Sequence, residues 1–397
     1  MKYLLFFINI FIYSLCLNSF SIKAQRPEII PYINFLKEQK THPVDYIFEL
    51  FEKYDIIILG ERDHRDLYQY ELIEKIISDK RFIENVGNVF MEFGMHNRTE
   101  WVNQILKNEY ATHDEFEKEL RYLYREYEFF GIWEKYNAWS FLSTIYRLNT
   151  KLTASQKINL FPTDVSFDWN NCRSREDWLA FNESFSLHNR FYRDSIMGNN
   201  MVAEYKKILM DDKKNRKKAL VIYNSPHSYQ SYFAENNKKI RSAASYIFKE
   251  FPEKTANVMI NWMIIKNNTK YNFIADGKWD AAFWALNNPS VGFDFKNSPF
   301  GTDKFDHYLP PLTDVKYQDI YTGFVFYGGV TSWNLTAGIP GIVDDEFKQE
   351  HLRRNKILND NASFETEKVY FNTVRTSSIY SDMPLRKIKR NNEKWLK

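Results

Sequence analysis

Cysteine, glycine and proline are scarce in this chain of 397 residues, which has 2 Cys, 13 Gly and 12 Pro. The low cysteine count excludes a small scaffold held by disulfides, and the low glycine and proline counts exclude collagen-like and low-complexity proteins. An excess of one charge is also missing, because 54 Lys and Arg stand against 51 Asp and Glu. This balance gives no reason to expect a nucleic-acid partner. With 44% hydrophobic residues, the chain can bury a sizeable core.

The N-terminus has the pattern of a secretory signal peptide. Lys2 precedes an apolar run over 3–17, and a small residue, Ala24, follows a short polar stretch. The run is shorter than the roughly 20 apolar residues of a membrane span, which favours a signal peptide over an anchor. We therefore expect removal of residues 1–24, a periplasmic or secreted mature protein, and no stable membrane insertion after cleavage.

Short runs of β-branched and aromatic residues recur along the chain and predict strands that are buried on both faces. They lie at 55–60, 88–92, 158–161, 219–223, 256–260 and 321–327. Helical patterns, such as 67–78 and 194–209, separate most of them. This alternation predicts an α/β fold, a layered and largely parallel sheet flanked by helices.

The chain has no Pro- or Ser-rich linker, which favours a single domain over 25–380 after the signal peptide. Residues 97–150 contain three helix-like stretches rich in Tyr, Trp and Glu, which we interpret as a helical insertion. Residues 268–318 contain turn-forming Asn-Asn-Pro-Ser and Leu-Pro-Pro-Leu sequences and are expected to be irregular. The basic residues of 381–397 are expected to form a solvated tail.

Acidic and histidine side chains follow four of the predicted strands, at the sheet edge where α/β proteins bind their ligands. Along the chain these residues are Glu61 and His64, then Glu92, Asp164 and His227. A carboxylate in an apolar strand, such as Glu92, is costly to bury unless it faces polar groups. We therefore expect these side chains to converge on one cleft.

The turn at 61–66 is the most highly charged of these segments. Asp66 and Gln69 have the spacing of a capping box for the helix that follows. The charged groups of this turn must be paired or exposed. The turn is therefore interpreted equally well as a surface turn with ion pairs or as part of a catalytic site.

This set of residues supports two chemistries. Carboxylates can fix the tautomer of a histidine that activates water as a general base, with a second histidine acting as an acid or as a donor to an oxyanion. The same groups can bind a divalent metal such as zinc or manganese. The residue types alone leave both open.

In their order along the chain, these residues resemble the erythromycin esterase-like family, whose superfamily includes ChaN-like haem-binding lipoproteins and Tiki-type membrane proteases. The matching motifs span about 55–230 and are Gly60-Glu61-x-x-His64, Glu92, Asp164, Arg193-Asp194-x-x-Met197-x-x-Asn200 and Asn224-x-x-His227. The resemblance implies an exported hydrolase in which His64 is the general base for cleavage of an ester, lactone or amide. Glu61, Glu92 and His227 then shape and charge the site.

The resemblance also implies a small-molecule substrate, bordered by Asp164, Asp194 and Asn200, and no cofactor. A polar helix face is the other interpretation of Asp194 and Asn200. Arg65 and Tyr68 stand where these esterases usually have a glycine and an acid, so a macrolide substrate does not follow. The superfamily leaves three alternatives: a ChaN-like protein that binds haem or a metal without turnover, a Tiki-like metal-dependent protease, and a degenerate member without activity.

Overall fold

The computed structural model describes residues 26–397 except 187–190, 214, 232, 236–237, 267–269, 308–313, 359–363 and 379–384. The expected signal peptide therefore lies outside the described residues. In the described part of the chain, no helix has both the length and the apolar composition that are needed to cross a bilayer.

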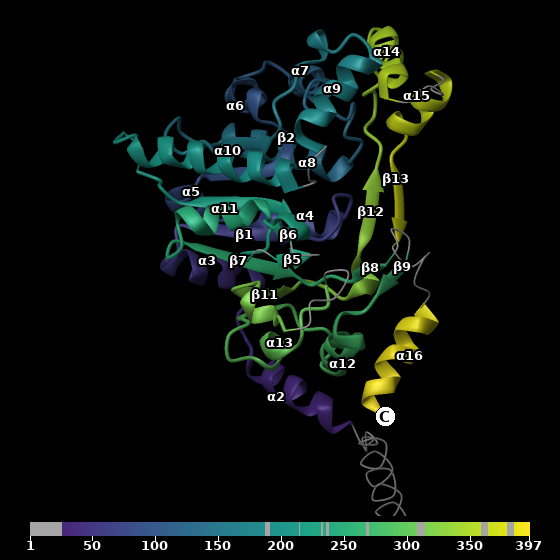
Figure 1. The fold of residues 1–397 in the computed structure, drawn as a ribbon. Helices are drawn as coiled ribbons and strands as arrows, with labels where there is room; N and C mark the ends of the chain where they lie inside the picture. The colour runs from purple at the N-terminus through teal and green to yellow at the C-terminus, as the bar shows by residue number, and fades with distance from the viewer. Residues whose placement is uncertain are drawn as a thin grey trace, which may run out of the picture.

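A twisted sheet runs through the centre of the molecule (Figure 1), and its strands within the described residues follow the order β10-β11-β7-β1-β4-β2-β3. Their bounds are β1 Ile56–Glu61, β2 Asn88–Met95, β3 Asn159–Asp164, β4 Ala219–Asn224, β7 Thr255–Ile260, β10 Val291–Asp294 and β11 Gly323–Phe326. Neighbouring strands are parallel except β10 and β11. All six predicted runs lie in this sheet, so the predicted α/β fold class is confirmed.

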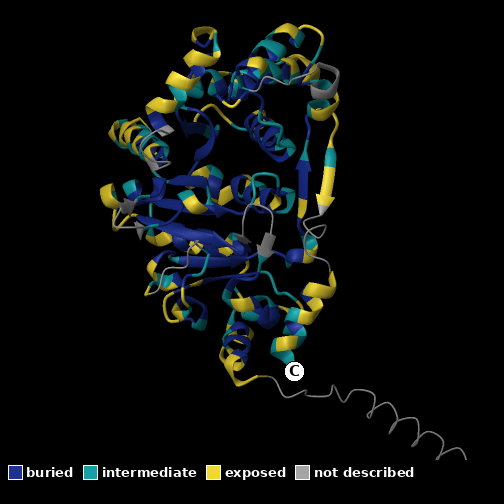
Figure 2. Cartoon of the chain, turned by 45° about the vertical axis from the view of Figure 1, so that its right-hand side comes forward, coloured by how far each residue is buried: buried dark blue, intermediate teal, exposed yellow. Residues whose placement is uncertain are grey.

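Helices cover both faces of the sheet, and alternate residues of β1 show how. Ile57 and Leu59 pack in one core with α3 (Pro43–Lys53) and α4 (Leu67–Ser78). Ile56 and Ile58 pack on the other face. All four side chains are fully buried, which is worth about 1.5–3 kcal/mol each. Figure 2 shows the buried strands in dark blue and exposed residues on the outer helices.

The other helices fall into three groups by position. The sheet faces are completed by α5 Lys80–Asn85, α6 Thr99–Lys107, α7 His113–Arg125, α8 Tyr136–Asn149, α10 Phe191–Met210 and α11 Ala243–Glu250. Around the β10 edge lie α2 Ile30–Glu38, α12 Lys278–Ala285, α13 Pro299–Thr302 and α16 Leu385–Leu396. At the opposite end (Figure 1) lie α9 Arg175–Ser186, α14 Lys348–Leu358 and α15 Phe364–Asn372. The stretch 97–150, interpreted as a helical insertion, contains α6, α7 and α8, whose apolar side chains pack in the core on one face of the sheet.

Within the described residues, three short antiparallel ribbons lie outside the main sheet. They pair β5 Phe233–Glu235 with β6 Lys238–Ile240, β8 Ile264–Lys266 with β9 Lys270–Asn272, and β12 Asn334–Ala337 with β13 Arg375–Ser378. The β12–β13 ribbon runs along one side of the molecule, between the α16 end and the α14–α15 end (Figure 1).

Two segments are more ordered than the sequence suggests. The stretch 268–318, expected to be irregular, contributes α12, α13 and the edge strand β10. Its aromatic side chains, including Trp279 and Phe293, form a buried core with Phe324 of β11, which accounts for this order. Residues Leu385–Leu396, expected in a solvated tail, form α16, which packs on α12 and buries Ile388.

Candidate active site

The turn after β1 holds Glu61 and His64 side by side. Nδ1 of His64 lies 2.7 Å from Oε2 of Glu61. The buried side chain of Gln69 fixes this turn, because its amide nitrogen donates to Oε1 of Glu61 at 3.3 Å and its oxygen accepts from the Arg62 N–H at 2.6 Å. The predicted cap is therefore half right: Asp66 accepts from the Tyr68 N–H at 2.9 Å, whereas Gln69 stabilises the site.

The remaining charges of this turn are paired. Arg62 and Asp66 form a buried ion pair at 2.7 Å, and Arg65 pairs with Asp63 at 2.9 Å. The ion pairs expected of this turn are therefore present, and they support a segment that also carries His64. Within the turn, 27% of the His64 side chain and 41% of the Arg65 side chain are exposed.

Segments far along the chain brace the same turn. The guanidinium of Arg62 lies 4.5 Å from the centre of the Trp333 ring, and the Thr336 N–H of β12 donates to the Arg65 carbonyl at 2.8 Å. The rings of Trp133 and His64 pack edge to face, and their centres are 4.8 Å apart. The C-terminal part of the chain therefore supports the first histidine.

Glu92 lies at an irregularity in β2. Three residues of β2, from Glu92 to Gly94, oppose the single residue Thr163 of β3. Gly94 has φ +101°, and a Cβ atom there would lie 2.4 Å from the ring of Tyr127, so only glycine suits the position. Such bulges redirect side chains near functional sites.

The second histidine, His227, lies in the 3-10 helix η4 (Ser225–His227), which follows β4. Its Nδ1 lies 2.6 Å from Oδ1 of Asp194 on α10. The same oxygen of Asp194 accepts from the Ala243 N–H of α11 at 2.8 Å. Asp194, expected to border the substrate, thus holds His227 in place.

Both histidines face Glu92. Oε1 of Glu92 lies 3.9 Å from Nε2 of His64 and 3.4 Å from Nε2 of His227. Its other oxygen, Oε2, accepts from the Asn224 N–H at 3.0 Å. The structure therefore brings Glu61, His64, Glu92 and His227 into one cluster at the carboxyl ends of β1, β4 and β2.

Arg193 also belongs to this cluster, although only its motif was evident from the sequence. Its guanidinium lies 3.3 Å from Oε1 of Glu92 and makes two bonds to the fully buried Asp164, at 2.8 and 2.5 Å. Asn200 donates to the Thr163 carbonyl at 2.9 Å. Both carboxylate oxygens of Asp164 are thus paired with Arg193, and the Asn200 amide makes one bond to the backbone of β3.

Glu128 is a buried carboxyl group that the sequence analysis missed. Its Oε1 accepts from the Gly94 N–H at 2.6 Å, whereas its Oε2 has no hydrogen-bond partner in the described structure. Burial and the nearby Asp164 raise the pKa of Glu128 well above its usual value. In the sequence Glu128 stands directly between two aromatic residues, Tyr127 and Phe129, and this position in an aromatic segment is the signal that could have identified it.

The charges of the cluster shift its pKa values in opposite directions. Burial lowers the pKa of His64, but the carboxylates of Glu61 and Glu92 outweigh it and raise the pKa to about 9. At His227 burial also lowers the pKa, but the carboxylates of Asp194 and Glu92 outweigh it, so the pKa of His227 is raised. Burial raises the pKa of Glu92, but His227 and the other cations lower it to about 2. At neutral pH Glu92 is therefore ionised between cationic groups.

One feature of the cluster disfavours a divalent metal. Arg193 lies against the Glu92 oxygen that faces both imidazoles, so a metal ion there would be close to a permanent cation. The Nδ1 atoms of both histidines are paired with carboxylates, an arrangement that metal-binding histidines also show. Across the described residues, no group of three or more His, Cys, Asp or Glu side chains is arranged to bind a metal.

Comparisons with known proteins give distant structural similarity only. No protein-family model matches the chain, and no curated protein matches it. A protein from Bacillus cereus has a TM-score of 0.45 and 12% identity, covering 75% of this chain and 97% of that one. A succinoglycan biosynthesis protein has a TM-score of 0.45 and 9% identity, covering 76% and 96%. A mutant of the erythromycin esterase EreC in its open conformation has a TM-score of 0.46 and 9% identity, covering 76% of this chain and 96% of that one.

Proposed function

We propose that this chain is a hydrolase that cleaves an ester, lactone or amide bond of a small molecule with water activated at His64. The observation that carries this proposal is the pair of imidazoles around Glu92, each held at Nδ1 by its own carboxylate. The order of the motifs, which resembles the erythromycin esterase-like family, supports the same class of reaction.

Glu61 gives His64 its chemical role in this mechanism. When His64 is neutral, its Nδ1–H donates a hydrogen bond to Glu61, so the lone pair is on Nε2. At 3.9 Å from Glu92, Nε2 makes no direct hydrogen bond to it and is available to take a proton from water. The resulting hydroxide adds to the carbonyl carbon, and the carbonyl oxygen becomes negative.

His227 stabilises that oxygen in the proposed reaction. Asp194 orients its ring, and its Nε2–H donates to the oxyanion while the carbon is tetrahedral. His64 then returns its proton to the leaving oxygen or nitrogen as the carbon–heteroatom bond breaks, which leaves a carboxylic acid and an alcohol or amine. Asp194 and Asp164 act through His227 and Arg193, so we propose no direct substrate contact for either.

The raised pKa of His64 sets the pH at which this reaction runs. With a pKa of about 9, most His64 side chains are protonated at pH 7, and the neutral base increases about tenfold per pH unit below the pKa. The rate should therefore rise with pH up to about 9. A base mechanism with a neutral optimum would require a different catalytic residue.

A panel of p-nitrophenyl esters and simple lactones, followed by absorbance and by pH-stat titration, tests the proposal. We expect hydrolysis that persists after treatment with EDTA and falls steeply in His64→Ala. Loss of activity on chelation, restored by zinc or manganese, would support the protease alternative instead. Turnover at the normal rate in His64→Ala would refute the mechanism.

Elemental analysis and a visible absorption spectrum of the purified protein test the absence of a cofactor. We propose that the site works without metal or haem, since Glu92 lies against Arg193. A Soret band or a stoichiometric transition metal would favour the ChaN-like alternative.

We also propose that the protein acts outside the cytoplasm, on the pattern of residues 1–24. N-terminal sequencing of the native protein should begin near Gln25. Soluble cytoplasmic protein with residues 1–24 intact would contradict export.

A further inference from the structure

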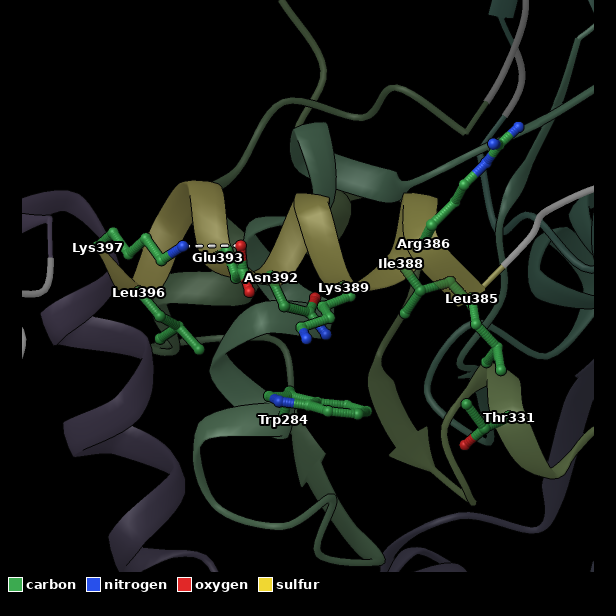
Figure 3. Close-up of a pocket in the computed structure, with 10 residues that line it drawn as sticks. All are labelled: Trp284, Thr331, Leu385, Arg386, Ile388, Lys389, Asn392, Glu393, Leu396 and Lys397. Carbon is green, nitrogen blue, oxygen red and sulfur yellow. Dashed lines mark hydrogen bonds and ion pairs between the residues drawn. The ribbon is translucent and has the colours of Figure 1, made fainter. Parts of the chain in front are cut away.

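A groove between α12 and α16 lies away from the candidate active site, on the core around β10 and β11. It has a volume of about 470 Å³, within the range of small-molecule sites. Trp284 of α12 lies on one side and α16 on the other (Figure 3). The sequence analysis assigned the α16 segment only to a solvated tail.

The apolar part of the groove is unusually exposed. The side chain of Trp284 is 45% exposed and that of Leu385 is 63% exposed, whereas Ile388 between them is buried. Leu396 lines the other end. A large exposed ring beside aliphatic groups offers a surface on which an apolar chain or ring can lie.

The charge around this surface is strongly positive. Residues 385–397 contain six Lys or Arg and one acid, Glu393, which pairs with Lys397 at 2.8 Å. Lys389 and Asn392 point from α16 toward the Trp284 ring, as Figure 3 shows, whereas Arg386 points away from it. Asp280 lines a narrow recess next to Trp284, and burial raises the pKa of this carboxyl to about 7, which weakens its negative charge.

The helix that carries these cations is firmly attached. Asn391 donates to the Gly277 carbonyl at 3.1 Å, and the Trp395 ring N–H donates to the Asp276 carbonyl at 2.9 Å. Both bonds lie outside the groove lining. The groove is therefore a property of the fold and not of a loosely placed terminus.

We infer that this groove binds an amphipathic anion, with its apolar body on Trp284 and its anionic group at Lys389. A bilayer surface fits less well, because Lys389 points toward the Trp284 ring across the groove, so that one small molecule can contact both (Figure 3). A single molecule with one anionic group, such as a long-chain carboxylate, matches both the groove and its charge.

The first test uses 1-anilinonaphthalene-8-sulfonate, an aromatic anion whose fluorescence rises on binding, with the full mature chain. We expect one site, with affinity that falls as salt increases. Trp284→Ala should weaken binding about tenfold, and Lys389→Gln about threefold. Tyr370→Ala, at another exposed aromatic residue, and Lys80→Gln, at another exposed helical lysine, serve as matched controls and should bind normally.

Competition identifies the source of the ligand. Monomeric dodecanoate, below its micelle-forming concentration, should displace the probe, whereas dodecyltrimethylammonium, with the opposite charge, should not. Equal displacement by both would overturn the charge recognition. Displacement by phosphatidylglycerol vesicles but not by dodecanoate would overturn the single-molecule site in favour of a membrane surface. Unchanged affinity in both Trp284→Ala and Lys389→Gln, with circular dichroism like that of the unmodified chain, would overturn the inference entirely.

Discussion

The two histidines that face Glu92 obtain their carboxylate partners from very different distances along the chain. Glu61 precedes His64 by three residues in one turn, whereas Asp194 and His227 are separated by 33 residues and come from α10 and η4. The resulting geometries are nearly equal, with distances of 2.7 and 2.6 Å. Similar chemistry has thus been built once by local sequence and once by packing.

The supports of the two pairs differ accordingly. The His64 turn is held by Gln69 and by contacts from the C-terminal part, at Trp333 and Thr336. The His227 pair depends on α11, whose Ala243 N–H binds Asp194. A local pair still requires remote bracing, because a charged turn is otherwise free to reorganise in water.

The largest effect is expected from removing the local histidine. His64→Ala should lower kcat/KM by roughly 10²–10⁴-fold, because it removes the proposed general base. His96→Ala is the matched control, since the His96 side chain has a similar exposure and pairs with Glu204 at 3.1 Å. Steady-state kinetics of both variants measure this difference. Equal activities of His64→Ala and His96→Ala would contradict the role of His64 as the general base.

Removing His227, whose carboxylate partner comes from α10, should lower the activity less than removing His64. His227→Ala should lower kcat by roughly 10²–10³-fold, the typical cost of one oxyanion donor. The pH at which activity rises should still follow His64. If the rise in rate with pH disappears in His227→Ala, the roles of the two histidines are reversed.

The carboxylates should differ in their effect on pH dependence. Glu61→Gln removes the carboxylate that raises the pKa of His64 most, so that pKa should fall from about 9 by about one to two units. The rise in rate should move to lower pH by the same amount, even though the maximum is reduced. Asp194→Asn should leave the position of that rise nearly unchanged. pH–rate profiles of kcat/KM measure both.

The smallest effect is expected at Glu128, beside the shared part of the cluster. Burial and the nearby Asp164 raise the pKa of Glu128 and so favour its neutral form, and Glu128→Gln keeps an uncharged group of similar shape at this position. The free energy of unfolding at pH 7 should change by less than about 1 kcal/mol. Asp164→Asn is the contrasting variant, since it removes the buried partner of Arg193 and should cost several kcal/mol. A large loss in Glu128→Gln would mean that Glu128 is ionised.

Local patterns were sufficient for the central strands and for part of the site. Runs such as 55–60 and 219–223 form parallel strands that are buried on both faces of the sheet. Their residues are therefore almost all apolar, and this pattern is visible in a short stretch of sequence. The edge strand β10 has only four residues and pairs antiparallel, so it left no comparable run. Its order comes from aromatic packing with distant residues.

The sequence by itself determined the α/β layering, the helix at 67–78 and the presence of acids and histidines after the strands. Only the tertiary structure decided that Arg193 pairs with Asp164 and Glu92, that Glu128 is buried beside them, and that α16 packs on α12. The reason is physical. Strand and helix periodicities are set by neighbouring residues, whereas a buried charge finds its partner in whichever remote segment the packing brings within a few ångströms.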